Sequence, residues 1–223
     1  MKFGVVVFPG SNCDRDIISA LQDEMQQEVV ELWHKDKDLS HFDSSDCIVL
    51  PGGFSYGDYL RCGAIAKFSP MMQQVIGFAN AGGKVLGICN GFQILCESGL
   101  LPGGLLRNAN MQFVCKNIYL TKEDDLNKQV FKIPVAHGEG RYYADEQTLN
   151  DLEKNSQILF KYCDKTGNVT ELSNPNGAAL NIAGICNVER NVIGMMPHPE
   201  RACSKSLNNE DGKKILSQLF SIN

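Results

Sequence analysis

A cysteine flanked by glycines is the first feature of this sequence that points to chemistry. Gly87-Ile88-Cys89-Asn90-Gly91 has the form G-x-C-x-G, with an apolar run before it and a helix-like stretch after it. This context is typical of a nucleophile elbow, which holds a reactive side chain at the carboxyl edge of a parallel sheet. The free amide groups at the start of the helix favour the thiolate over the thiol. The pattern predicts a nucleophile at Cys89, although a buried structural cysteine fits so short a motif equally well.

A cysteine nucleophile needs a histidine to handle its proton and an acceptor to orient that histidine. Of the four histidines, His34 and His41 lie in a polar stretch where we expect surface residues. His198 is followed by Pro199 and Glu200, and the prolines on both sides of His198 favour a stiff, extended backbone. Residues i and i+2 of an extended segment point to the same side, so we expect Glu200 to orient His198.

His137 is the rival base, because Glu139 stands two residues after it. Gly138 makes this segment flexible, which suits the approach of backbone to a ligand better than the fixing of a base. Stiffness alone favours His198, and an ordinary surface pair of histidine and glutamate remains the alternative at both places.

Thioester formation passes through an oxyanion that needs two hydrogen-bond donors. The backbone N–H of Asn90, directly after Cys89, is one candidate. Pro51-Gly52-Gly53 ends an earlier apolar run, and Gly53 can turn its N–H inward because it has no side chain. A plain Pro-Gly turn is the alternative for this second donor.

Composition limits the other functions open to the chain. Its 223 residues are 43% hydrophobic and 21% charged with a net charge of −5, which is ordinary for a soluble globular protein. A mildly acidic chain has no general attraction for nucleic acid or anionic membranes. The N-terminal apolar run is too short for a signal peptide and no run is long enough to span a membrane, so we expect a cytoplasmic protein. The nine cysteines show no zinc-ligand spacing, so we expect no metal and mostly buried thiols.

Short apolar runs and helix-like stretches alternate in the first half of the chain. Strands are predicted at 3–8, 28–33, 46–50 and 84–88, and helices at 11–26 (with Ser11 or Asn12 as the N-cap), 59–67, 69–81 and 90–98. The second half has strand-like stretches at 112–120, 131–136, 157–163, 178–187 and 191–196, and a terminal helix at 206–220. The pattern predicts one α/β domain over residues 1–223. We expect a flavodoxin-like, mostly parallel sheet with helices on both faces and antiparallel additions in the C-terminal half.

Three separated motifs resemble those of the class I (triad) glutamine amidotransferases: Gly87-x-Cys89-Asn90-Gly91-x-Gln93, Pro51-Gly52-Gly53 and Pro197-His198-Pro199-Glu200. Longer segments are similar to the stand-alone glutaminase subunits of phosphoribosylformylglycinamidine synthases, which act in purine biosynthesis: residues 8–16, 51–70, 87–95, 133–145 and 195–201. The resemblance covers essentially the whole chain, and GFSYGDYLR and HGEGRY are its most specific parts. Cys62, where alanine is expected, is a small departure that does not touch the chemistry.

The resemblance implies a role for each matching residue. Cys89 attacks the side-chain amide carbon of glutamine, His198 moves protons and Glu200 orients His198. Gly53 and Asn90 supply the oxyanion amides. Three further residues contact the bound glutamine: Gln93, His137 and Gly138. On this resemblance the base is His198 and not His137.

The resemblance also implies partners. The ammonia passes to a separate synthetase subunit, which uses ATP and magnesium to convert formylglycinamide ribonucleotide to the amidine, and a small bridging subunit completes the complex. This chain has no ATP-binding glycine-rich loop, and we expect no cofactor in it. Residues 54–61 and 138–143 are our candidates for the docking face. We expect the free subunit to have weak glutaminase activity that rises in the complex.

Two other interpretations remain open at this point. The triad can serve another acceptor subunit or a free cysteine hydrolase, but a hydrolase would not need Gln93 or the GFSYGDYLR loop. A non-catalytic or flavin-binding module of flavodoxin-like fold would be marked by loss of the cysteine or of the His–Glu pair, and all three residues are present.

Overall fold

The computed structural model of the chain describes residues 1–122 and 129–221. The chain divides into two compact units, the first of residues 1–102 and 186–194 and the second of residues 103–185 and 195–223. The single domain over residues 1–223 stays a prediction. No helix within the described ranges is long and apolar enough to cross a membrane.

Parallel strands form the centre of the first unit. β1 (Lys2–Val7) lies between β2 (Glu28–Trp33) and β3 (Cys47–Leu50), and β3 also pairs with β4 (Lys84–Ile88), every pair being parallel. β11 (Val192–Met195) follows β4 in the strand order. The inner strands β1, β3 and β4 are buried almost throughout, which explains why they are continuous apolar runs in the sequence.

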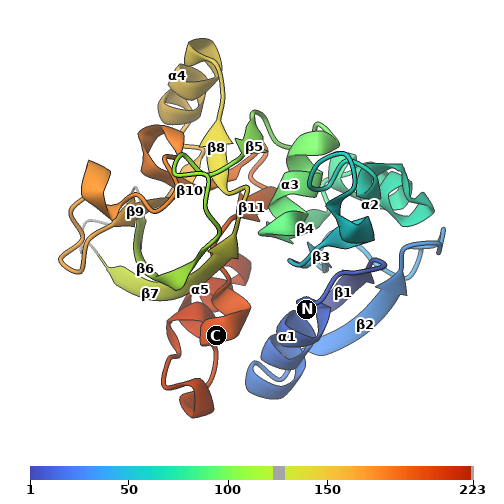
Figure 1. Cartoon of the computed structure of the whole chain (residues 1–223). Helices are drawn as coiled ribbons and strands as arrows, with labels where there is room; N and C mark the ends of the chain where they lie inside the picture. Colours follow the sequence, from blue (N-terminus) through green and yellow to red (C-terminus); the bar gives the residue numbers. More distant parts are fainter. Residues whose placement is uncertain (123–128, 222–223) are drawn as a thin grey trace. The chain divides into compact units, whose positions relative to one another are not determined.

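Helices connect these strands. α1 (Asp14–Ser19) continues into a π-helical turn (Ala20–Glu24) and leads from β1 to β2, whereas α2 (Pro70–Asn80) leads from β3 to β4. The two crossovers run in opposite directions along the order β2-β1-β3-β4, so right-handed connections place α1 and α2 on opposite faces. α3 (Asn90–Glu97) starts directly after β4 and packs against β3 and β4 (Figure 1). The predicted flavodoxin-like arrangement is confirmed.

The second unit is built on antiparallel strands. β6 (Val114–Lys122) lies between β7 (Val130–His137) and β9 (Ile158–Cys163), and β9 also pairs with β10 (Ile182–Cys186). β5 (Gly104–Leu106) and β8 (Arg141–Tyr143) form a separate antiparallel pair. The helices are α4 (Glu146–Lys154) and α5 (Asp211–Phe220), and α5 packs against β7. The predicted antiparallel additions in the C-terminal half are confirmed.

The predicted helix at 59–67 is wrong. Short 3-10 turns lie at Ser55–Asp58 and Ala66–Phe68, and the backbone between β3 and α2 is otherwise irregular. Within the predicted helix, Leu60 and Gly63 have left-handed φ values of 73° and 77°, and Tyr56, Gly57 and Asp58 just before it are also left-handed. A right-handed helix cannot include such residues, and the hydrogen bonds that this segment makes to α3 take the place of helical ones.

Smaller differences concern helix ends and short elements. Ser11 does not cap α1, because its hydroxyl donates to the carbonyl oxygen of Phe8 at 2.9 Å, and the residue before the helix is Cys13. The terminal helix begins at Asp211 instead of 206, after a 3-10 turn at Lys205–Leu207. The strands β5 and β8 and the helix α4 were not predicted.

Candidate active site

Cys89 occupies the sharp turn between β4 and α3. Its φ of 51° and ψ of −103° lie outside the ordinary regions for a residue with a side chain. A Cβ atom on Gly91 would lie 2.0 Å from the carbonyl oxygen of Leu50, and one on Gly87 would lie 2.6 Å from the backbone of Gly91. Gly91 therefore packs too closely on β3, and Gly87 too closely on Gly91, for either to carry a side chain, as a nucleophile elbow demands.

The loops that follow β1 and β3 pack against each other at the same edge of the sheet. Gly53 has a φ of 115°, and a Cβ atom on it would lie 2.5 Å from the backbone nitrogen of Asn12. Gly10 accepts a hydrogen bond from the N–H of Phe54 at 3.4 Å. Gly53 thus lies at the carboxyl end of β3, next to the strand that carries Cys89, in a position where no other residue fits.

The side chain of Asn90, for which no sequence pattern predicted a role, is buried in the same region. Its Nδ2 donates to Oε1 of Gln93 at 2.8 Å and to Oδ1 of Asp58 at 2.9 Å. Its Oδ1 accepts hydrogen bonds from the N–H and the hydroxyl of Ser55. The first unit therefore brings Gly53, Asn90 and Gln93 close to the elbow at Cys89.

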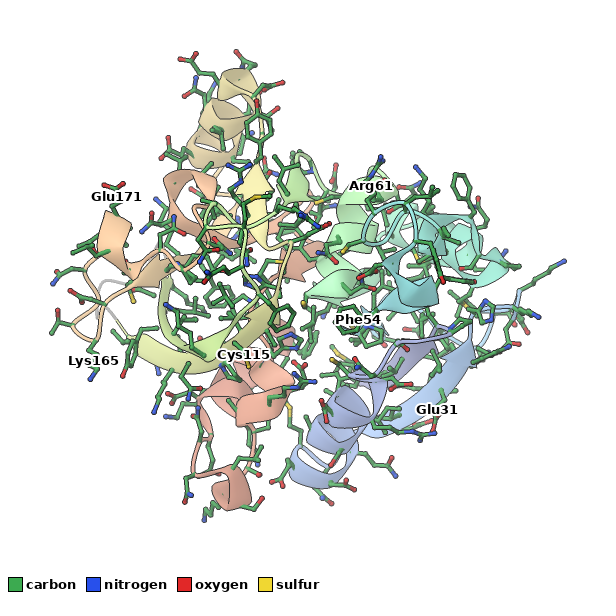
Figure 2. All side chains as sticks on the ribbon, in the orientation of Figure 1. Glu31, Phe54, Arg61, Cys115, Lys165 and Glu171 are labelled. Atoms are coloured by element: carbon green, nitrogen blue, oxygen red, sulfur yellow. The ribbon has the colours of Figure 1, made fainter. Side chains whose placement is uncertain are left out.

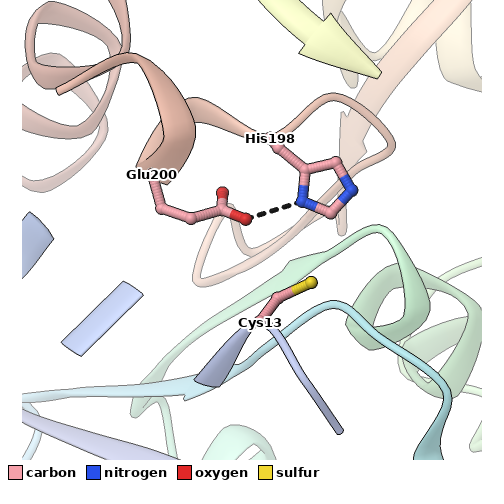
Figure 3. Close-up of side chains that lie close together, drawn as sticks. All are labelled: Cys13, His198 and Glu200. Carbon is pink, nitrogen blue, oxygen red and sulfur yellow. Dashed lines mark hydrogen bonds and ion pairs between the residues drawn. The ribbon is translucent and has the colours of Figure 1, made fainter. Parts of the chain in front are cut away.

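His198 and Glu200 form a buried pair in the second unit. Nδ1–H of His198 donates to Oε1 of Glu200 at 2.6 Å, and each side chain is 1% exposed (Figure 3). The N–H of His198 donates to the carbonyl oxygen of Pro134 on β7 at 2.9 Å. Because Glu200 holds the proton on Nδ1, Nε2 is the ring nitrogen left for proton transfer.

The side chains of His198 and Glu200 are hydrogen-bonded as predicted, but the backbone that carries them is not extended. Pro199–Ala202 form a 3-10 turn, so Glu200 reaches back to His198 across the start of that turn. α5 packs closely against this turn, since a Cβ atom on Gly212 would lie only 1.8 Å from the carbonyl oxygen of Pro199. The stiffness that the prolines imply is therefore increased by close packing.

His137 is held differently. Its Nδ1 lies 3.1 Å from Oδ1 of Asn108, and its Nε2 lies 3.5 Å from Nδ2 of Asn176. Nδ2 of Asn108 donates to backbone carbonyls, so Oδ1 is its acceptor and Nδ1 of His137 carries the proton. Burial, and then the charge of His198, lower the pKa of His137 to about 4. Nε2 of the neutral His137 ring thus faces the side-chain amide donor of Asn176. This arrangement suits substrate positioning better than proton transfer.

The glycines around His137 have different environments. A Cβ atom on Gly140 would lie 2.4 Å from the His137 ring, so only glycine lets the ring lie there. Gly138 accepts a hydrogen bond from the N–H of Asn108 at 2.9 Å. Glu139, the predicted companion of His137, forms an ion pair with Arg107 at 3.9 Å.

Asn108 and Asn176, which contact the His137 ring, are site residues that sequence reasoning missed, because asparagine in a turn usually serves the turn itself.

The prediction that His34 lies on the surface is wrong, whereas His41 is exposed as expected. His34 is 4% exposed and its Nδ1 is hydrogen-bonded to the hydroxyl of Tyr56. The ring packs edge-on against Trp33 and Tyr56, with ring centroids 4.5 Å and 5.3 Å away. Burial lowers the pKa of His34, so the neutral ring acts as part of the packing.

Comparison with known proteins identifies the family. The model of the CobB/CobQ-like glutamine amidotransferase domain matches residues 1–221. The chain belongs to this glutamine amidotransferase family. Membership favours the amidotransferase over the two other interpretations, a free cysteine hydrolase and a flavin-binding or regulatory module.

Proteins of known sequence and structure resemble the chain over nearly its whole length. The phosphoribosylformylglycinamidine synthase subunit PurQ of Moorella thermoacetica is 55% identical, over 98% of this chain and 95% of the relative. PurQ of Acaryochloris marina is 54% identical, over 95% of this chain and 92% of the relative. The solved structure of PurLQS from Thermotoga maritima contains a chain that matches with a TM-score of 0.82 and 38% identity, covering 99% of this chain and 97% of that one.

Proposed function

We propose that the chain is the glutaminase subunit of a phosphoribosylformylglycinamidine synthase in purine biosynthesis. The observation that supports this most strongly is the identity of more than half of the residues, over nearly the full length, with relatives that carry this name. The elbow at Cys89 and the His198–Glu200 pair have the local geometry that the reaction needs.

In the first half of the proposed reaction, the Cys89 thiolate attacks the side-chain amide carbon of glutamine. The carbonyl oxygen becomes an oxyanion, which the backbone N–H groups of Gly53 and Asn90 stabilise. His198 gives the proton on Nε2 to the leaving nitrogen while Glu200 holds Nδ1–H. The C–N bond breaks, ammonia departs and a thioester joins the glutamyl group to Cys89.

The second half of the reaction hydrolyses this thioester. His198 takes a proton from water, and the resulting hydroxide adds to the thioester carbonyl through a second oxyanion at the same two donors. The C–S bond breaks, glutamate leaves and Cys89 is restored as the thiolate. Three residues bind the glutamine during both halves: Gln93, His137 and Gly138.

The ammonia has to reach an acceptor that this chain does not contain. We propose that the chain works with a synthetase subunit of the PurL type and a small PurS-type bridging subunit, because the name PurLQS of the Thermotoga maritima structure joins these two components to PurQ. The synthetase subunit uses ATP and magnesium to convert formylglycinamide ribonucleotide to the amidine, and this chain carries no cofactor itself. The complex is cytoplasmic, where the synthetase finds its ATP.

A reconstituted complex tests this proposal. With the synthetase and bridging subunits present, amidine formation from glutamine should depend on this chain and should be lost in Cys89→Ala. Amidine formation from added ammonium salt should survive in the same variant, because the synthetase step remains intact. Glutamine-dependent amidine formation by the Cys89→Ala complex at the wild-type rate would contradict the proposal.

A further inference from the structure

The carboxamide of Asn90 has all of its hydrogen-bonding capacity in use. Oδ1 accepts from the N–H of Ser55 at 3.1 Å and from the Ser55 hydroxyl, while Nδ2 donates to Asp58 and to Gln93 at 2.9 Å and 2.8 Å. Asn90 is 1% exposed and Ser55 is 2% exposed. A buried amide with two accepted and two donated bonds is fixed in orientation.

The segment that Asn90 holds does not have a relaxed conformation. Tyr56, Asp58 and Leu60 are non-glycine residues with left-handed φ, and each carries backbone strain. Such a backbone persists only where surrounding contacts determine it. The bonds from Asn90 to Ser55 and Asp58 meet the segment at the beginning and end of its first turn, Ser55–Asp58.

The same loop is tied to the far end of α3. Arg61 makes two hydrogen bonds to the Glu97 carboxylate, one of them from Nη2 to Oε2 at 2.6 Å, and Lys67 lies 3.7 Å from Oε2 of Glu97. Between the two ends, a Cβ atom on Gly63 would lie 2.8 Å from the backbone nitrogen of Ile94. The loop thus follows α3 along its length. Figure 2 labels Phe54 and Arg61, and the left-handed residues Tyr56, Asp58 and Leu60 lie between them in the sequence.

The hydrogen bonds of Asn90 lie next to the two proposed oxyanion donors, and the inference drawn from them rests on the proposed function. Ser55 stands two residues after Gly53, and Asn90 stands directly after Cys89. The bond between Ser55 and Asn90 therefore joins the two segments whose backbone N–H groups are assigned to the oxyanion. We propose that the Asn90 carboxamide, braced by Asp58, is a positioning device that sets the two oxyanion donors at their working separation.

The strongest test replaces the side-chain NH2 group of Asn90 by an oxygen atom. Asn90→Asp keeps the shape and the two bonds from Ser55, but it turns the bond to Asp58 into a contact between two carboxylates. The bond to Gln93 can be kept, because the Gln93 amide can turn and donate from its Nε2 to the new carboxylate. Since the oxyanion exists only after attack on glutamine, misplaced donors should lower kcat and leave KM nearly unchanged. We expect kcat for glutamine hydrolysis in the reconstituted complex to fall about 100-fold, with KM within about threefold.

A second substitution separates the contact between residues 58 and 90 from the presence of a carboxylate at residue 90. In Asn90→Asp with Asp58→Asn, the new amide of residue 58 donates to the carboxylate of residue 90, and its carbonyl oxygen still accepts from Cys62, whose sulfur lies 3.1 Å from Asp58 Oδ2. The double variant keeps the carboxylate at residue 90, next to Cys89, while residues 58 and 90 together carry one carboxylate, as in wild type, instead of the two of the single variant. Recovery of kcat to within about tenfold of wild type would thus show that the contact between residues 58 and 90 sets kcat, and not the carboxylate at residue 90 by itself.

The controls make each outcome decisive. Asn110→Asp makes the same chemical change at an exposed turn, where Oδ1 only accepts from the N–H of Gln112, and should keep wild-type kinetics. Wild-type kcat in a folded Asn90→Asp, or no recovery in a folded double variant, would overturn the inference while loss of activity in Cys89→Ala still supported the proposed function. A rise of KM by about 100-fold with kcat unchanged would also overturn it, because Asn90 would then act on substrate binding alone.

Discussion

Replacing Gly91 by alanine tests the elbow at its tightest contact. The new methyl carbon would lie 2.0 Å from the carbonyl oxygen of Leu50 and 2.7 Å from its carbonyl carbon. An ordinary contact is about 3.5 Å, so the elbow or β3 has to move by about 1.5 Å. Overpacking of this kind costs about 1–3 kcal/mol in the free energy of unfolding. A nucleophile displaced by about 1 Å loses about 100-fold in rate.

Gly77→Ala is the matched control. Gly77 lies within α2, and a Cβ atom on it would meet no atom within 4 Å, so alanine should stabilise the helix by about 0.5–1 kcal/mol. Urea unfolding followed by circular dichroism measures both changes, and glutaminase assays of the reconstituted complex measure kcat. If Gly91→Ala matched wild type in both stability and kcat, the close packing of the elbow against β3 would be refuted.

Three further predictions concern histidines and thiols. His198→Ala should remove nearly all glutaminase turnover and His137→Ala should only weaken it; the reverse order in kcat would contradict the assignment of the base. Because the pKa of His137 is lowered from 6.5 to about 4, the unfolded chain binds this proton more readily, so stability should fall as the pH drops from about 6.5 towards 4. The contribution of His137 should lower the free energy of unfolding by about 2 kcal/mol at pH 5 relative to pH 7, as measured by urea unfolding. A folded His137→Asn variant should lack this contribution. A maleimide at neutral pH should label the exposed Cys115 before the buried Cys47, whose pKa is raised by burial, and mass spectrometry of peptides from wild type and Cys115→Ser checks the order.

Apolar patterning predicted the strands well because burial decides both the pattern and the strand. The runs at 46–50 and 84–88 coincide with β3 and β4 to within one residue, and almost every residue of these two strands is buried. The elbow was predictable for a related reason, since Gly91 lies against β3 and Gly87 lies against Gly91 in contacts that no side chain can fit. Residue type and short-range spacing therefore carry the local geometry of Cys89 and of the His198–Glu200 pair.

The errors fall where contacts between distant residues decide the conformation. Residues 59–67 were predicted as a helix, but the ion pairs of Arg61 and Lys67 with Glu97 hold them in another form. His34 stands among charged residues in the sequence, yet Tyr56, 22 residues later, covers its ring. Asn108 and Asn176 contact His137 across 29 and 39 residues, and no local pattern records such contacts.

Labelling by a glutamine-analogue electrophile tests the central claim most directly. The complex is treated with one equivalent of the analogue per glutaminase subunit, and labelled peptides are identified by mass spectrometry. We expect stoichiometric modification of Cys89, protection by excess glutamine and no labelling in Cys89→Ala, although eight other cysteines remain. Labelling of another cysteine with loss of activity, or none with the partner subunits present, would contradict the assignment of Cys89 as the nucleophile.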